Sequence, residues 1–399
     1  MNIGILREYK VPVERRVPLT PMQCKHVQNI FGVNIYVQSS DSRCFTDSQY
    51  IDQGIDVVDC LKDCDIILGI KEVPIDLLID NKTYLYFSHT IKKQEYNRCL
   101  LQAMIDRNIT MIDYETLRDS SNKRVLGFGR YAGIVGCYNA FLTYGLKYKR
   151  YNLVPAYESK GLEDVISQLN NIVLSNEKIV LTGNGKVAHG ALEILNYANI
   201  TEVTPDEFLE SEFNFPVFVR IDTLDYNKRI DNKLLGKQDF YKHPDMYESL
   251  FMKYARYADI FIAGHFYGLG SPYLFTRKDA RSDDFNIKVV ADISCDIDGP
   301  VASTIRSSTI EEPIYGYNPL TEQEDNFMHD DVIAVMAVDN LPCELPKDSS
   351  EDFGNDLINK VFPDLFSNQT SEVIDNGTIC RSGKLMDSFL YLEEYLKNI

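Results

Sequence analysis

The stretch KIVLTGNGKVAHGALEILNY, residues 178–197, decides the fold. Its first five residues form an apolar, β-branched run typical of a buried strand, and the pattern after residue 185 is that of a helix. A glycine turn between a strand and a helix lets the backbone approach a pyrophosphate, which the helix N-terminus then attracts. The alternative is an ordinary strand–helix turn, but the context favours a dinucleotide site. The residues predicted to bind NAD or NADP here are Gly183, Asn184, Gly185, Lys186, Val187 and Ala188, with Ala188 at the position usually held by a third glycine.

Strands and helices alternate on both sides of this stretch. The expected strands before it are 2–6, 34–40, 64–70, 82–89 and 109–115, and helical spacing fits 21–31 and 91–106. Two further apolar strands follow it, at 258–265 and 287–294. Alternation of this kind predicts parallel sheets of the α/β class. The last segment, 383–399, has the pattern of an amphipathic helix.

A chain of 399 residues is too long for one ordinary core, so we expect two domains. Residues 128–149 are apolar or small all round, as in a buried helix that connects two domains. The predicted fold is α/β, with two Rossmann-like domains, parallel sheets and a cleft between them. Residues 1–130 with 320–399 are expected to form the substrate domain, and 131–319 the NAD(P)-binding domain. A homodimer is expected from the general preference for two-fold assembly.

The charge balance limits the classes of partner. The formal net charge is −18, and charged residues make up 25% of the chain. Phosphate backbones and anionic membrane surfaces repel such a protein, so neither nucleic acid nor a membrane is an expected partner. Basic residues gathered in a site would instead hold small anionic substrates.

Targeting and metal signals are weak. The first ten residues carry Arg7, Glu8 and Lys10, unlike a signal peptide, and no apolar run reaches the ~18–20 residues that span a bilayer. The nine cysteines lack metal-finger spacing, since Cys60 and Cys64 have no second cysteine–histidine pair downstream. We therefore expect a reduced, cytoplasmic protein and no metal site.

Two successive expected strands end in groups suited to proton transfer. The run 64–70 leads directly into Lys71, and the strand 82–89 ends at His89. Either side chain alone is more simply explained as a solvated strand end. Parallel strands place their carboxyl ends at one edge of the sheet, where open α/β sheets bind ligands, so the two together indicate a site.

Other charged residues after strands are further candidates for the site. Arg16, in VERRVPLTP, comes after the first strand and suits a carboxylate, although a surface charge is about as good an explanation. Asp296 belongs to VVADISCDIDGP, whose three aspartates lack the ladder of a calcium loop. His265 ends an apolar strand and is a weaker candidate. Glu202 is not placed cleanly at the end of a second strand, so the choice between NAD and NADP stays open.

With these residues assembled, the chain resembles the alanine dehydrogenase, transhydrogenase and saccharopine dehydrogenase superfamily over nearly its whole length. The shared motifs are ERRVPLTP (14–21), GIKEVP (69–74), YFSHT (86–90) and VLTGNGKVAHGA (180–191). KRVLGFGRYAG (123–133) resembles the lysine-forming saccharopine dehydrogenases. ADISCDIDGP, STIRSSTIEEPIYGYNP and AVDNLPCELP are similar to the lysine–ketoglutarate reductase portion of the bifunctional lysine-degrading enzyme.

The resemblance implies roles for particular residues. Arg16 matches the arginine that holds the substrate carboxylate, and Arg124 lies where saccharopine enzymes carry a basic residue for a second carboxylate. Lys71 and His89 match the pair that moves protons, and Asp296 matches an aspartate near the nicotinamide. Asp339, Asn340, Leu341 and Pro342 match a loop near the nicotinamide. The segment 206–250 is long and polar and departs from the alanine dehydrogenase pattern, which puts the adenosine contacts in doubt.

Three functions follow as hypotheses. The first is an NAD(P)-dependent oxidoreductase on CH–NH donors of saccharopine type, acting on an amino acid and a 2-oxo acid. The second is alanine dehydrogenase, with pyruvate and ammonia. The third is an idle nucleotide-binding homologue, against which the retention of Arg16, Lys71, His89 and Asp296 argues. Members with different substrates share this skeleton, so the sequence leaves the substrate pair and the direction of reaction open.

Overall fold

The computed structural model describes residues 1–367, 369 and 371–397. The chain divides into two compact units, Met1–Phe128 with Pro346–Ile399, and Gly129–Leu345. Each unit is built around its own sheet.

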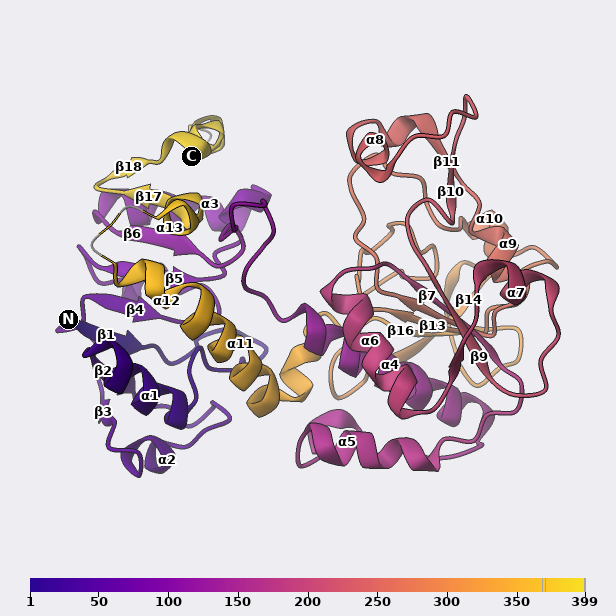
Figure 1. Cartoon of the computed structure of the whole chain (residues 1–399), viewed down its shortest axis with the longest axis horizontal. Helices are drawn as coiled ribbons and strands as arrows, with labels where there is room; N and C mark the ends of the chain where they lie inside the picture. The colour runs from indigo at the N-terminus through magenta and orange to yellow at the C-terminus, as the bar shows by residue number, and fades with distance from the viewer. Residues whose placement is uncertain (368, 370, 398–399) are drawn as a thin grey trace. The chain divides into compact units, whose positions relative to one another are not determined.

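The first unit contains a mainly parallel sheet, as the sequence predicts. Its order is β18-β17-β6-β5-β4-β1-β2-β3, with eight strands among the described residues. The strands are β1 (Asn2–Ile5), β2 (Asn34–Gln38), β3 (Asp56–Val58), β4 (Ile66–Leu68), β5 (Thr83–Tyr86), β6 (Thr110–Asp113), β17 (Thr378–Arg381) and β18 (Lys384–Leu385). β1 to β6 run parallel, whereas β17 pairs antiparallel with β6 and β18 pairs antiparallel with β17, both yellow in Figure 1. The carboxyl ends of β1, β4, β5 and β6 therefore lie next to one another.

The C-terminal segment differs from its helical pattern. Residues 384–385 form β18, residues 387–392 a 3₁₀-helix, and only Glu393–Leu396 an α-helix, α14. Residues 398–399 lie outside the described part. The antiparallel pairing of β18 with β17 holds the start of this segment extended, which overrides the local preference for helix.

Helices cover the first sheet. They are α1 (Pro21–Phe31), α2 (Asp47–Ile51), α3 (Glu95–Asp106), α11 (Pro346–Lys360), α12 (Phe362–Leu365) and α13 (Glu372–Gly377). α1 begins at a capping box, in which Thr20 accepts from the backbone of Gln23, and ends at Gly32 with φ 64°. Its buried face includes Cys24 and Val27.

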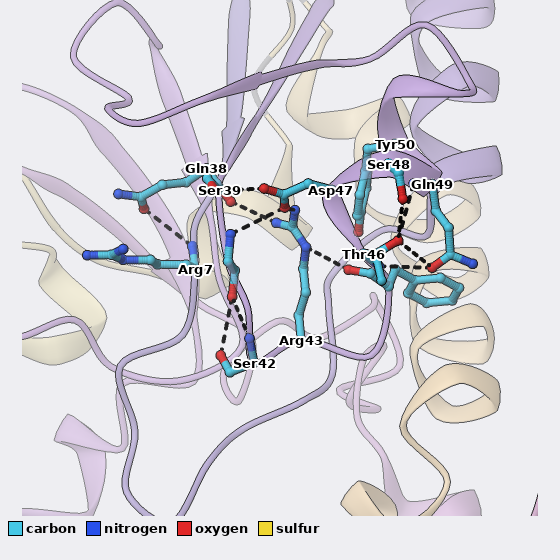
Figure 2. Close-up of polar contacts among 12 residues, drawn as sticks. Arg7, Gln38, Ser39, Ser42, Arg43, Thr46, Asp47, Ser48, Gln49 and Tyr50 are labelled. Atoms are coloured by element: carbon cyan, nitrogen blue, oxygen red, sulfur yellow. Dashed lines mark hydrogen bonds and ion pairs between the residues drawn. The ribbon is translucent and has the colours of Figure 1, made fainter.

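A buried arginine fixes the corner between β2 and α2 (Figure 2). The Arg43 guanidinium donates to the carbonyls of Gln38 at 2.7 Å and Phe45 at 2.9 Å, and pairs with the Asp47 carboxylate. The guanidinium carbon of Arg43 lies 4.6 Å from the centre of the Tyr50 ring. A side chain so surrounded holds the loop in one conformation.

This corner supports the turn that carries Arg16. The Cys44 N–H donates to the carbonyl of Arg15 at 2.8 Å, and the Tyr50 hydroxyl donates to the carbonyl of Leu19 at 2.9 Å. The arginine turn is therefore attached at both ends to the β2–α2 corner.

The second unit also has a mainly parallel sheet with eight described strands. Its order is β15-β14-β16-β13-β12-β7-β9-β8. The strands are β7 (Lys178–Thr182), β8 (Thr201–Glu202), β9 (Val217–Ile221), β12 (Ile260–Ala263), β13 (Val289–Asp292), β14 (Ile314–Asn318), β15 (Gln323–Asp325) and β16 (Ile333–Met336). β8, β9, β7, β12, β13 and β16 run parallel, whereas β14 and β15 are antiparallel.

Two boundaries differ from the prediction. β16 pairs with β13, with Val289 opposite Ala334, so residues 320–345 belong to the second unit and the chain returns to the first unit at Pro346 rather than 320. The first crossover falls at Gly129 rather than 131. β14, β15 and β16 pair within the second sheet, so the chain cannot leave this unit before β16 has ended.

α4 (Gly129–Tyr148), the predicted buried helix, packs against α6 (Lys186–Tyr197), as Figure 1 shows. A Cβ at Gly133 would lie 1.8 Å from the carbonyl oxygen of Val187, and one at Gly190 would lie 1.9 Å from that of Arg130. Backbone therefore meets backbone at this crossing, and only glycine fits.

Shorter elements complete the second unit. They are α5 (Leu162–Gln168), α7 (Pro205–Glu210), α9 (Met252–Ala255) and α10 (Arg277–Ala280). The polar segment after β9 forms an antiparallel hairpin of β10 (Asn227–Arg229) and β11 (Tyr247–Ser249), with α8 (Lys237–Lys242) between them. Within the described residues, no helix is long and apolar enough to cross a membrane.

Candidate active site

Lys71 lies at the carboxyl end of β4, held through its backbone. The N–H groups of Ile70 and Lys71 donate to the two carboxylate oxygens of Glu8, at 2.6 and 3.0 Å. The N–H of Phe87 donates to the Ile70 carbonyl at 3.0 Å, so β4 and β5 stay joined up to this point. Lys71 itself is half-buried. The backbone at Lys71 is thus fixed by the sheet and by the Glu8 carboxyl group.

Glu8 is a half-buried acid that sequence reasoning missed. Burial raises its pKa to about 8, and the charge of Glu14 adds to this effect, while the two backbone N–H donors and Arg16 oppose it. Glu8 therefore holds a proton at neutral pH. The motif LREYK gives no local sign of this, because the burial comes from strands that are distant in sequence.

His89 follows β5, has its backbone in the left-handed region with φ 55°, and is half-buried. Its Nδ1 lies 3.1 Å from Oε2 of Glu115, and its ring stacks on Phe87 with centroids 6.3 Å apart. Burial acts to raise the pKa of Glu115, but the hydrogen bond with His89 and the charges of Lys92 and Arg124 outweigh it and lower the pKa to about 2. An ionised carboxylate therefore orients the imidazole.

Glu115 follows β6, and its N–H donates to Oδ1 of Asp113 at 2.7 Å. Asp113 also accepts from the Ser88 hydroxyl and the Ser88 N–H, and burial raises its pKa to about 6. This buried network joins the ends of β5 and β6, which fixes His89 opposite Glu115. The sequence signal for Glu115 was its place at the end of the strand 109–115.

Arg16 is buried in a bidentate pair with Glu14. Its Nε donates to Oε1 at 2.8 Å and its Nη2 donates to Oε2 at 2.6 Å. The guanidinium carbon lies 4.0 Å from the centre of the Phe128 ring, and the next N–H, that of Val17, donates to Ser350 on α11 at 2.9 Å. The residue predicted to hold a substrate carboxylate thus already has a carboxylate partner.

Arg124 is exposed and lies with its guanidinium carbon 5.4 Å from the centre of the Phe87 ring. Its charge helps to lower the pKa of Glu115, which places it on the same side of the site as His89. The first unit therefore has Lys71 and His89 after the adjacent parallel strands β4 and β5, as the sequence predicted, and Arg124 lies in the loop between β6 and α4.

The second unit has a cavity of about 580 Å³ at the carboxyl edge of its sheet. It is lined by residues that follow β7, β9, β12 and β13, among them Gly183, Gly185, Asp222, His265, Ser294 and Asp296. The sheet order changes direction at β7, between β9 and β12, which is where α/β sheets bind nucleotides. The glycine turn and Asp296 are thus in one cavity.

The glycine turn is shaped for close approach. Gly183 has φ 100°, and a Cβ there would lie 2.6 Å from the carbonyl oxygen of Gly264. Gly185 precedes α6, and a Cβ there would meet open space. Ala188 is fully buried beneath the turn. The N-terminus of α6 is therefore open toward the cavity, as a pyrophosphate requires.

His265 supplies an independent indication of a ligand. It is 8% exposed, and its Nδ1 lies 2.9 Å from the Thr182 hydroxyl. Its Nε2 is buried and has no hydrogen-bond partner among the described residues. Burial lowers its pKa to about 4, so the ring is neutral at neutral pH. A buried ring nitrogen on a cavity wall normally has a hydrogen-bond partner, and a polar group of a bound dinucleotide would supply one.

Asp222 is a second residue that sequence reasoning missed. β9, not β8, is the neighbour of β7, so the acid at the end of the adjacent strand is Asp222. Glu202 lies on the edge strand β8 and pairs with Arg220, at 3.3 Å. The signal was the apolar run VFVRI directly before Asp222.

The remaining predicted residues lie on the same edge. Asp339 and Asn340 follow β16, and Leu341 and Pro342 are buried in the turn after them. Asp292 is buried and accepts hydrogen bonds from Ser294 and Thr304, both at 2.7 Å. Within the described residues, no group of three or more potential ligands is arranged to hold a metal ion.

These features define an α/β protein of two units, and residues 4–135 match the N-terminal domain of alanine dehydrogenase/PNT. An alpha-aminoadipic semialdehyde synthase from Arabidopsis thaliana is 30% identical over 89% of this chain and 37% of its own length. The Bos taurus protein of that name is 29% identical over 96% of this chain and 47% of its own length. A lysine-forming, NAD⁺ saccharopine dehydrogenase from Schizosaccharomyces pombe is 26% identical over 88% of this chain and 90% of its own.

Solved structures agree on the fold. An L-alanine dehydrogenase superposes with a TM-score of 0.63 at 15% identity, covering 100% of this chain and 99% of the other. A transhydrogenase from Sinorhizobium meliloti superposes with a TM-score of 0.59 at 13% identity, covering 96% of this chain and 99% of the other.

Residues 4–135 thus match the alanine dehydrogenase/PNT N-terminal domain, and over most of its length the chain is similar to lysine-forming saccharopine dehydrogenases and to part of the alpha-aminoadipic semialdehyde synthases. It spans less than half the length of the semialdehyde synthases that it matches.

Proposed function

We propose that this protein is an NAD(P)-dependent dehydrogenase of the lysine-forming saccharopine type. It would catalyse the reversible reductive amination of a 2-oxo acid by an amino-acid amine. The observation that carries the proposal is the placement of Lys71 and His89 after adjacent strands, with Nδ1 of His89 3.1 Å from the Glu115 carboxylate.

The residues of the first unit supply proton transfer and anchoring. Lys71 accepts a proton from the attacking amine, so that the nitrogen can bond to the oxo carbon. Protonated His89 donates a proton to the oxygen, which leaves as water when the carbon–nitrogen double bond forms. Glu115 stabilises the imidazolium before that step. Arg124 binds one substrate carboxylate. Arg16 is the candidate for the other, beside its partner Glu14.

The residues of the second unit hold the cofactor. The backbone at Gly183 to Val187 would bind the pyrophosphate, and His265 would give or accept one hydrogen bond to the dinucleotide. Bound there, the nicotinamide supplies or accepts the hydride. Asp296 lines the same cavity and would lie near the ring.

The test is the absorbance of reduced nicotinamide with purified full chain. NADH and NADPH are each offered with lysine plus 2-oxoglutarate, then with pyruvate plus ammonia. Oxidation only with lysine and 2-oxoglutarate is the expected result. Oxidation only with pyruvate and ammonia would make the protein an alanine dehydrogenase. Silence with both pairs, with the nucleotide still bound, would leave an idle homologue or another substrate pair.

A further inference from the structure

An ion pair lies on the wall of the nucleotide cavity. Asp222, at the end of β9, pairs through Oδ2 with the ammonium of Lys237, and both residues line the cavity. The other oxygen, Oδ1, accepts the N–H of Thr223 at 2.7 Å. The side chain of Asp222 is 24% exposed and that of Lys237 is 42% exposed, so both reach solvent in the cavity.

Lys237 comes from the hairpin segment that the alanine dehydrogenase pattern did not explain. It is the first residue of α8, between β10 and β11, and Tyr241 of the same helix also lines the cavity. The long polar insertion therefore has a definite place, since it builds one wall of the nucleotide cavity.

The strand order indicates which half of a bound dinucleotide would lie beside Asp222 and Lys237. With its pyrophosphate at the glycine turn, a dinucleotide extends to both sides of β7. Ser294 and Asp296 lie on the β13 side, and Asp222 on the opposite, β9 side. In dinucleotide folds an acid on that side binds the ribose hydroxyls of the adenosine half. Asp222 and Lys237 thus face the position that distinguishes NAD from NADP.

Charges around this position are nearly balanced. Arg220 lies two residues before Asp222 on β9 and donates to the Asn184 amide oxygen at 3.2 Å, while Glu202 pairs with it. Asp225 accepts the N–H of Asp222 at 2.7 Å. An aspartate alone would repel a 2′-phosphate, and a lysine alone would favour it. Exposed ion pairs are weak, so Lys237 can leave Asp222 for another anion at small cost.

We propose that the Asp222–Lys237 pair lets the cavity accept both dinucleotides, with Asp222 binding the ribose hydroxyls of NADH and Lys237 turning to the 2′-phosphate of NADPH. This rests on the proposed nucleotide-binding function and specifies its cofactor. In the wild type, the dissociation constants for NADH and NADPH lie within about tenfold of each other, since neither charge acts alone.

The test is equilibrium binding without substrate, by calorimetry and by the fluorescence of the reduced nicotinamide. Lys237→Met weakens NADPH binding by about tenfold or more and changes NADH binding by less than about threefold. Asp222→Asn does the opposite, because it weakens NADH and leaves NADPH unchanged or tighter. Lys237→Arg retains NADPH affinity. Lys242→Met, an exposed residue of the same helix, is the matched control and changes neither.

The outcomes separate the two ideas. If Lys237→Met and Asp222→Asn move both dissociation constants in parallel, or if the wild type prefers one dinucleotide by more than about a hundredfold, the pair does not set cofactor choice. If the wild type binds neither dinucleotide, the proposed function fails together with this inference. A thermal melt of each variant confirms that the fold is retained.

Discussion

Glu14 and Arg16 form a buried, two-pronged ion pair, with the carboxylate 1% and the guanidinium 3% exposed. Such pairs are costly to desolvate, and removing one partner leaves the other charge stranded. The arginine assigned to the substrate by sequence is therefore also part of the structure of the first unit.

Replacing Arg16 by Met should lower the free energy of unfolding by about 3–5 kcal/mol, because Glu14 is left buried without its counter-charge. Glu14→Gln with Arg16→Met should recover much of this loss. Urea denaturation of the two single variants and the double variant gives the coupling energy. Strictly additive losses would contradict a tight pair.

Lys71→Met should reduce kcat/KM by about 10²–10⁴-fold, the usual contribution of a positioned acid or base. Nucleotide affinity should not change, because the glycine turn belongs to the other unit. Lys25→Met, at an exposed position of the first unit, is the control. Full activity of Lys71→Met with the true substrate would make the catalytic assignment wrong.

His265→Ala should weaken dinucleotide binding about 5- to 100-fold, the range expected for one lost hydrogen bond in a buried site. His265 has its pKa lowered to about 4 by burial, so its contribution should be constant between pH 5.5 and 8. The exposed His329→Ala is the control. An unchanged dissociation constant would show that Nε2 does not face the nucleotide.

Glu344 should make the protein less stable as pH rises. Burial raises its pKa to about 8, and the charge of Glu311 adds to this effect, although Asn139 donates to its Oε1 at 2.9 Å. Between pH 4.5 and 8 the folded state binds a proton that the unfolded state lacks. The free energy of unfolding therefore falls with rising pH, by up to about 1.4 kcal/mol per unit.

Glu344→Gln should remove the part of this slope that Glu344 contributes, since an amide does not titrate in that window, and should leave the parts due to Glu8 and Asp113. Denaturation curves of wild type and variant at several pH values measure the difference between them. Glu163→Gln, at an exposed position, should leave the slope as in wild type. Curves that stay parallel for Glu344→Gln would exclude a protonated Glu344 in the fold.

Arg43→Met should lower the free energy of unfolding by about 1–3 kcal/mol, because carbonyls of Gln38 and Phe45 lose a charged donor. Arg256→Met, which breaks the exposed pair with Asp284, should change it by less than about 1 kcal/mol. Chemical denaturation measures both. Equal effects would mean that the buried corner carries no special stability.

Much of the site could be predicted because its signals are local. An apolar run followed by Lys71, and another followed by His89, place both residues at one edge once the strands are parallel. The glycine turn could also be predicted, since glycines at this spacing mark a backbone that no side chain covers. These features need no knowledge of distant residues.

Other features were decided by pairing between segments far apart in the chain. Asp222 became the acid beside the glycine turn only because β9 lies between β7 and the two-residue β8. Glu8 acquired its raised pKa from burial under β4, and the segment 383–399 gave up part of its helical pattern to pair with β17.

The sequence by itself determined the α/β class, the glycine turn and the strand ends that carry Lys71 and His89, because periodicity and turn chemistry act over a few residues. Tertiary structure alone decided strand order, the return of the chain at Pro346 and the partners of Arg16, Asp222 and His265. The reason is that burial and hydrogen-bond partners depend on which segments meet, and that choice is made by the whole core rather than by any one stretch.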